Sequence, residues 1–187
     1  EVSRQELNRR NRSETPKQYS QRVKYQPTDY KGVNIREFFT HDRLVFTTQV
    51  RGDTDTYTVT VAFLGGLEEI INRLDVIPRL NLREVTTALT RAYANNDVFV
   101  RCSCDDFKYR RAYMATIDGY IYGDPEMRPN RFKRTNKELK GATCKHLAGL
   151  LSNQNWLIKV ASAINNYIRL YPDQVFEFLG YSSEDEL

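Results

Sequence analysis

The chain has 187 residues, of which 40% are hydrophobic, 12% aromatic and 28% charged, with a formal net charge of +4. This length and composition indicate a globular protein with one domain or two small ones, and the lack of an 18-residue apolar run excludes a membrane-spanning helix. The first thirty residues also lack the apolar stretch of a signal peptide, so we expect a reducing cytoplasm, that of a cell or of an infected host.

The positive charge is concentrated at the N-terminal end of the chain. Residues 1–36 hold nine Lys/Arg and four Asp/Glu, whereas the rest of the chain holds 19 and 20. The segment has almost no apolar periodicity, and Pro16 and Pro27 interrupt it. We therefore expect an extended basic arm that binds phosphates, straps onto neighbouring subunits, or stays solvated. The candidate binding residues of the arm are Arg9, Arg10 and Arg12.

Two strands follow the arm. Residues 44–50 and 56–64 are rich in β-branched and aromatic side chains, and the second run alternates strictly between apolar and polar positions. The residues between them, 51–55, are typical of a turn. This pattern predicts a β-hairpin, with Tyr57, Val59, Val61 and Phe63 on one face of its second strand.

Helical periodicity governs most of the remaining chain. Asn81 with Glu84 three residues later is a capping box, which marks the start of one of these helices. A short strand at residues 98–101 leads into the first cysteines, and Trp156 is expected to anchor the packing of the last helix. The predicted helices cover residues 67–74, 81–94, 144–151 and 156–168.

All three cysteines and one of the two histidines lie in two short pieces of the chain. Cys102 and Cys104 are separated by one residue, and so are Cys144 and His146. Three thiolates and one imidazole form a Cys3His set, the ligand number and softness that tetrahedral Zn²⁺ takes in structural sites. We predict that these four residues bind zinc, and that the metal stabilises the fold without doing chemistry because no coordination position stays open.

Other interpretations of the same residues are weaker. A disulfide between Cys102 and Cys104 would close a small strained ring and leave one cysteine over. A nucleophile–base pair of Cys144 and His146 is disfavoured because positions i and i+2 of a helix point to different sides. Ordinary burial of all four residues remains the plain alternative. His41 is expected to be structural or exposed.

At these residues the sequence resembles SWIM-type zinc fingers, in which Cys-x-Cys is followed by Cys-x-His at the start of an apolar helix. Phe107 after the first pair and Lys145 inside the second are also similar to that family. The resemblance covers roughly residues 57–151 and includes the strand pair ahead of the first cysteines. It implies a DNA-binding or protein-binding module and no catalytic residue. The 39 residues from Asp105 to Thr143 are a longer gap than the family usually has.

The second part of that gap, residues 123–141, reads as a long basic loop with two prolines. Basic side chains interleaved with aromatic ones suit phosphate backbones, and a solvated loop explains the composition equally well. The candidate binding residues of the loop are Arg128, Arg131, Lys133 and Arg134.

Taken together, the sequence predicts an α+β fold with a small antiparallel sheet, helices packed on it and a zinc-clamped ββα-like SWIM core. The predicted domains are the arm (1–36), a zinc-binding domain (37–170, with its ligands in 101–151) and an acidic tail (171–187). No catalytic constellation, membrane partner or small-molecule substrate is expected.

A weaker resemblance to SWIM-bearing proteins of large tailed bacteriophages is carried by Gly65-Gly66 and by residues 101–110 and 155–168. It favours a non-enzymatic assembly protein, a virion component whose arm binds other subunits. The alternative is a nucleic-acid-binding module that contacts phosphates through the arm and residues 128–140.

Overall fold

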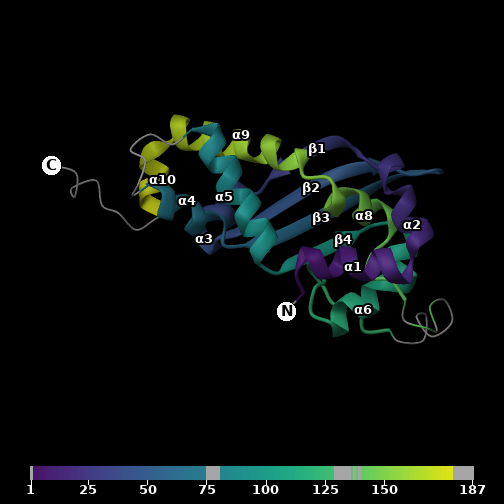
Figure 1. Ribbon diagram of the computed structural model, residues 1–187. Helices are drawn as coiled ribbons and strands as arrows, with labels where there is room; N and C mark the ends of the chain where they lie inside the picture. Colours follow the sequence, from purple (N-terminus) through teal and green to yellow (C-terminus); the bar gives the residue numbers. More distant parts are fainter. Residues whose placement is uncertain (1, 75–80, 129–135, 137, 139, 179–187) are drawn as a thin grey trace.

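The computed structural model describes residues 2–74, 81–128, 136, 138 and 140–178. The predicted α+β fold is confirmed: one antiparallel sheet with strand order β1-β2-β3-β4 carries helices (Figure 1). The strands are β1 (Pro27–Val33), β2 (Arg43–Arg51), β3 (Thr56–Leu64) and β4 (Val98–Cys102).

The predicted hairpin is formed by β2 and β3. Val50 lies opposite Tyr57, and the turn is closed by a hydrogen bond from the Gly52 amide to the Asp55 carbonyl at 2.7 Å. The predicted face of β3 is buried, and Thr60 and Ala62 on its opposite face are buried as well. The fully buried members of the predicted face are Val59, Val61 and Phe63.

The four predicted helices of the body lie within two residues of their predicted bounds, whereas its other helices were not predicted. Helix α5 begins where the capping box places it, since the Asn81 side chain accepts a hydrogen bond from the Glu84 amide at 3.1 Å. The segment η2 is a π-helix. The helices after β1 are α3 (Ile35–His41), α4 (Gly66–Leu74), α5 (Leu82–Asn95), η2 (Phe107–Arg111), α6 (Ala112–Ile117), α8 (Lys145–Ser152), α9 (Asn155–Leu170) and α10 (Pro172–Phe178).

The centre of the core lies where α5 and α9 cross the sheet (Figure 1). Trp156 stacks on Phe46 of β2 with ring centroids 4.5 Å apart, and meets Tyr93 of α5 edge-on at 5.3 Å. Its indole N–H donates to the Leu150 carbonyl at 3.2 Å. Trp156 is therefore the packing anchor that the sequence indicates, with its one polar atom satisfied.

The prediction of an extended N-terminal arm is wrong. Residues 1–36 contain α1 (Arg4–Glu14), α2 (Pro16–Ser20), the 3-10 helix η1 (Gln21–Lys24) and β1, which is the edge strand of the sheet. Leu7 is fully buried in the common core, so the segment belongs to the body.

Two local signals in this segment account for the difference. The Ser3 hydroxyl accepts a hydrogen bond from the Glu6 amide at 3.2 Å and caps α1, which is the Ser-x-x-Glu pattern of a helix start. Pro16 is the first residue of α2, a position where proline is favoured, rather than a helix breaker. Some polar side chains of the segment, among them Asn8, Arg10 and Asn11, hydrogen-bond to the body, while others such as Arg12 are exposed.

Some predictions fall on residues that the structure does not describe. They concern residues 129–135, 137 and 139 of the predicted loop 123–141, and the predicted acidic tail from residue 179; the first part of that tail forms helix α10. Over the part that is described, none of the helices has the length and apolar character needed to cross a membrane.

Candidate metal centre

The first ligand pair is placed by the end of strand β4. Cys102 pairs with Val59 of β3, and the ladder continues one residue further, because the Ser103 amide donates to the Thr58 carbonyl at 2.9 Å. The Ser103 hydroxyl accepts from the Thr58 amide at 3.0 Å. The pleat therefore turns Cys102 to the core side, and Cys104 follows directly after the last pairing.

The second pair stands at the start of helix α8. Cys144 is the N-cap residue with an extended backbone (φ −77°, ψ 168°), and His146 lies in the first turn. Cys144 precedes the first residue of the helix and has an extended backbone. The rule that side chains at positions i and i+2 of a helix point to different sides therefore does not apply to it. The sequence argument that these two side chains cannot meet was wrong for this reason.

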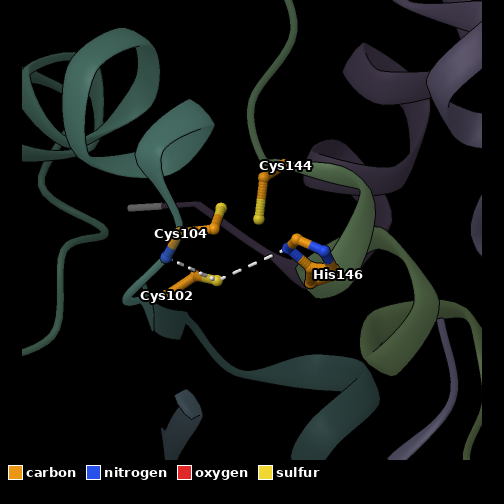
Figure 2. A group of neighbouring side chains, drawn as sticks. All are labelled: Cys102, Cys104, Cys144 and His146. Atoms are coloured by element: carbon orange, nitrogen blue, oxygen red, sulfur yellow. Dashed lines mark hydrogen bonds between the residues drawn. The ribbon is translucent and has the colours of Figure 1, made fainter. Parts of the chain in front are cut away.

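The four side chains converge on one point. Their ligand atoms all lie within 4.8 Å of one another, and Cys102 Sγ is 3.9 Å from His146 Nδ1 (Figure 2). A tetrahedral ion with metal–sulfur bonds of about 2.3 Å holds its sulfurs about 3.8 Å apart, so the group matches such an ion with small shifts. Each of the four residues is at most 4% exposed. Together they form a group that can hold a metal ion, as predicted.

Backbone amides point at two of the sulfurs. The Cys104 amide donates to Cys102 Sγ at 3.5 Å, and the Phe107 amide donates to Cys104 Sγ at 3.4 Å. Such hydrogen bonds favour the thiolate form that a metal ion requires.

The three thiols do not ionise alike. Hydrogen bonding to Cys104 raises the pKa of Cys102, whereas hydrogen bonds from Cys102 and Cys144 lower the pKa of Cys104. Burial raises the pKa of the Cys144 thiol, and its contacts with Cys102 and Cys104 act in the same direction. The group therefore holds its negative charge mainly on Cys104, and a bound cation would displace protons from the other two thiols.

Two tyrosines enclose the histidine ring. Tyr25 meets the ring of His146 edge-on with centroids 5.0 Å apart, and Tyr57 packs against it at 4.6 Å. Lys145, between the two ligands, points outward and donates to Asp53 Oδ2 at 2.6 Å, to which the Tyr25 hydroxyl also donates at 2.8 Å. The hairpin turn is thereby tied to the ligand helix, and the metal group is shielded from water on this side.

Side chains far from Cys144 in the sequence hold the residues just before it, 141–143, by hydrogen bonds, and we call this group of side chains the clamp. The amide oxygen of Asn11, a buried residue of α1, accepts from the Ala142 amide at 3.1 Å and from the Thr143 amide at 2.9 Å. Its amide nitrogen donates to the Thr143 hydroxyl at 2.6 Å. The Tyr120 hydroxyl donates to the Ala142 carbonyl at 2.9 Å.

Gly141 completes this clamp. Its amide donates to the Glu14 carboxylate, and its carbonyl accepts from Arg111 Nη1 at 3.2 Å. Gly141 has a φ of +71°, and a Cβ there would lie 2.7 Å from the Arg111 guanidinium and 2.8 Å from Thr15. Glycine is required at this position by both the backbone and the contact.

The predicted binding residues differ in their surroundings: some are paired with a carboxylate, one is exposed without such a partner, and the others are not described. Arg9 forms a bidentate pair with Glu6 at 2.7 Å, and Arg10 is mostly buried in a 2.8 Å pair with Asp118. Arg12 is exposed and has no carboxylate partner among the described residues. Arg128 is paired with Glu126 through two 2.7 Å bonds. The remaining three, Arg131, Lys133 and Arg134, lie outside the described residues.

Sequence reasoning missed the side chains of the clamp. Asn11, Arg111 and Tyr120 carry no motif, and only the Ser-x-x-Glu helix start could have indicated that α1 is folded. His41 is exposed and bonded to the Thr40 hydroxyl at 2.8 Å, and it is not part of the metal-binding group. Comparison of the chain with protein-family models, with curated protein sequences and with solved structures finds no match.

Proposed function

We propose that this chain is a non-enzymatic, zinc-stabilised module that binds nucleic acid. The metal part of the proposal is carried by the convergence of three buried sulfurs and one imidazole nitrogen. Soft thiolates with imidazole favour Zn²⁺ over the harder Mg²⁺ or Ca²⁺. The SWIM-like spacing of the same four residues supports zinc further.

The proposed role of the zinc is structural. Four protein ligands fill a tetrahedron and leave no position for water or substrate. The ion would join the end of β4 to the start of α8, two segments 40 residues apart in the chain. Its binding free energy would then be part of the folding free energy.

The nucleic-acid part rests on unpaired positive charge on folded elements. Among the described residues, five cations between residues 4 and 24 form no ion pair with a carboxylate, although the other two, Arg9 and Arg10, do. On a folded surface such an excess favours a polyanionic partner, because phosphates gain from each neutralised contact and counterions are released. These five residues are Arg4, Arg12, Lys17, Arg22 and Lys24.

The second candidate function is an assembly protein, a bacteriophage virion component as the weaker resemblance suggests. The extended strap on which that hypothesis relied is absent, because residues 4–33 are folded into the body. Subunits would have to bind the folded surface instead. We rank this function second for that reason.

The experiment is a binding titration of the zinc-loaded protein with labelled oligonucleotides at several salt concentrations. Phosphate contacts predict that log K falls linearly with log salt. No binding at low salt, or binding that salt does not weaken, would exclude the nucleic-acid function. A salt-independent oligomer in analytical ultracentrifugation would favour assembly in its place.

A further inference from the structure

A polar groove lies between the N-terminal helices and the junction of α8 with α9. It is a shallow depression, mostly open to solvent, with a volume of about 490 Å³. None of the residues that line it is acidic. Apart from Gly149, its lining consists of one arginine, one hydroxyl and four side-chain amides: Arg22, Ser152, Gln26, Asn153, Gln154 and Asn155.

Helix α1 presents one polar stripe to this junction. Arg4, Asn8 and Arg12 are spaced four residues apart and so share a helix face. The Asn8 amide donates to the Leu151 carbonyl at 3.4 Å. Arg4 Nη2 lies 3.1 Å from the side-chain oxygen of Gln154 when that amide is turned to accept. Arg4 and Asn8 thus contact the α8–α9 junction, whereas Arg12 contacts Tyr19, and none of the three lines the groove itself.

The ring of Tyr19 contacts two arginines, Arg12 and Arg22. The Arg22 guanidinium lies 4.1 Å from the centroid of the Tyr19 ring, and that of Arg12 lies at 5.4 Å. Arg12 also donates to the Tyr19 hydroxyl at 3.4 Å. Burial would raise the pKa of Tyr19, but Arg12, Arg22 and Ser152 outweigh it and lower the pKa. The Tyr19 hydroxyl thus accepts from Arg12, while the Arg22 guanidinium lies on the Tyr19 ring and donates to the Tyr19 main-chain carbonyl at 3.0 Å. Neither arginine has a carboxylate partner among the described residues.

We propose that this groove binds a segment of single-stranded nucleic acid, with a backbone phosphate between Arg12 and Arg22 and a base edge against the amides of the α8–α9 junction. The inference rests on the proposed function and names the surface that carries it. Neither guanidinium has an acid partner among the described residues, so a phosphate bound beside the Tyr19 ring gains from both positive charges.

The amides favour an unpaired strand over other polyanions. Side-chain amides donate and accept at once, which matches the Watson–Crick edges of bases. Those edges are exposed in a single strand and hidden in a duplex. Asn153 is already bonded inside the protein, since its amide nitrogen donates to Gln26 Oε1 at 2.6 Å and its amide oxygen accepts from the Asn155 main-chain amide at 2.9 Å. The exposed Asn155 side chain is therefore the amide offered to a base edge. An acidic peptide would use the arginines but leave that amide without a matching group.

The test is fluorescence anisotropy of the zinc-loaded full chain with a labelled single strand of about 12 nucleotides. The variant is Arg12→Gln/Arg22→Gln. One single-strand phosphate bound by both arginines corresponds to about 0.7 in the slope of log K against log salt, so the slope should fall by about 0.7 and the affinity by about tenfold at low salt.

The matched control is Arg83→Gln/Arg169→Gln, which removes the same charge from exposed arginines of α5 and α9. Arg169 lies 14 residues along α9 from Asn155, about 21 Å away. The control should change affinity less than twofold. Equal losses in the two double variants, with zinc content and circular dichroism intact, would overturn the groove while leaving nucleic-acid binding in place.

A second variant tests the amides. Asn155→Ala removes an exposed side chain at the start of α9 and should weaken single-strand binding about fivefold without changing the salt slope, as expected for a base contact. Equal affinity for a duplex of the same sequence, or displacement by polyglutamate at equal charge concentration, would overturn the single-strand assignment. Failure of the wild-type chain to bind any oligonucleotide would instead reject the proposed function.

Discussion

The two ligand pairs are held in place by different means. Cys102 and Cys104 are set by the main chain, because β4 pairs with β3 up to Ser103. Cys144 and His146 are set by side chains, because the residues before Cys144 are gripped by Asn11, Glu14, Arg111 and Tyr120.

The two ligand pairs also differ in how far apart in the sequence the residues that hold them lie. The pairing of Ser103 with Thr58 belongs to a sheet whose pattern is visible locally in the sequence. The contact between Asn11 and Thr143 spans 132 residues and depends on a single amide. A ladder tolerates the loss of one side chain, whereas a side-chain clamp does not, so substitutions should affect the two pairs unequally.

The largest effect is expected when one of the four metal-binding side chains is replaced. Cys104→Ser should abolish stoichiometric zinc, because a hydroxyl is a poor substitute for the thiolate that carries most of the negative charge. Structural zinc binding contributes about 10–16 kcal/mol in small zinc-finger peptides, and here the large core reduces the dependence of folding on it. Elemental analysis and thermal unfolding measure the two effects. Unchanged zinc content in this variant would refute the assignment of the ligands.

The next largest expected effect is the pH dependence of zinc binding, which distinguishes the three thiols by their protonation state. The pKa of Cys102 and that of Cys144 are raised, so both thiols keep their protons near neutral pH in the metal-free chain, while the lowered pKa of Cys104 leaves it ionised. Zinc binding should therefore release about two protons, and its dissociation constant should fall about a hundredfold per pH unit on going up from pH 7. Calorimetry in buffers of different ionisation enthalpy counts the protons. A release near zero would contradict the raised pKa values.

A smaller effect is expected when the side-chain clamp alone is broken. Asn11→Ala leaves two buried amides and the Thr143 hydroxyl without a partner, which should cost about 2–4 kcal/mol of unfolding free energy. It should also weaken zinc binding by about 10- to 100-fold, as loss of an outer-shell contact does. Denaturant unfolding and zinc competition measure both losses.

Ser13→Ala is the control for this variant, because Ser13 is exposed on the same helix and bonds only to carbonyls of its own turn. It should change stability by less than about 0.5 kcal/mol. If the two variants behaved alike, α1 would not be positioning the second pair.

The same contrast explains what the sequence could and could not predict. The hairpin, the capped start of α5 and the cysteine at the end of β4 follow from alternation, turn chemistry and capping, which act over a few residues. The packing of residues 2–36 was missed because its core residues, Leu7 and Tyr25, are too few to show a helical period, and its attachment depends on buried polar residues such as Asn11. A polar residue that is buried and fully bonded looks the same in a sequence as one that is solvated.

The smallest expected effect comes from a side chain beside the first ligand pair, and it tests whether main-chain pairing alone holds that pair. Ser103→Ala removes the hydroxyl that accepts from the Thr58 amide, at the site next to both ligands of the first pair. The contact is solvent-exposed, and the ladder bond from the Ser103 amide to the Thr58 carbonyl survives the substitution, so the loss should stay below about 1 kcal/mol, with zinc affinity changed less than threefold. Unfolding and zinc competition under the conditions used for Asn11→Ala give the direct contrast. A loss as large as that of Asn11→Ala would mean that the first pair also depends on a side chain, and that main-chain pairing alone does not hold Cys102 and Cys104.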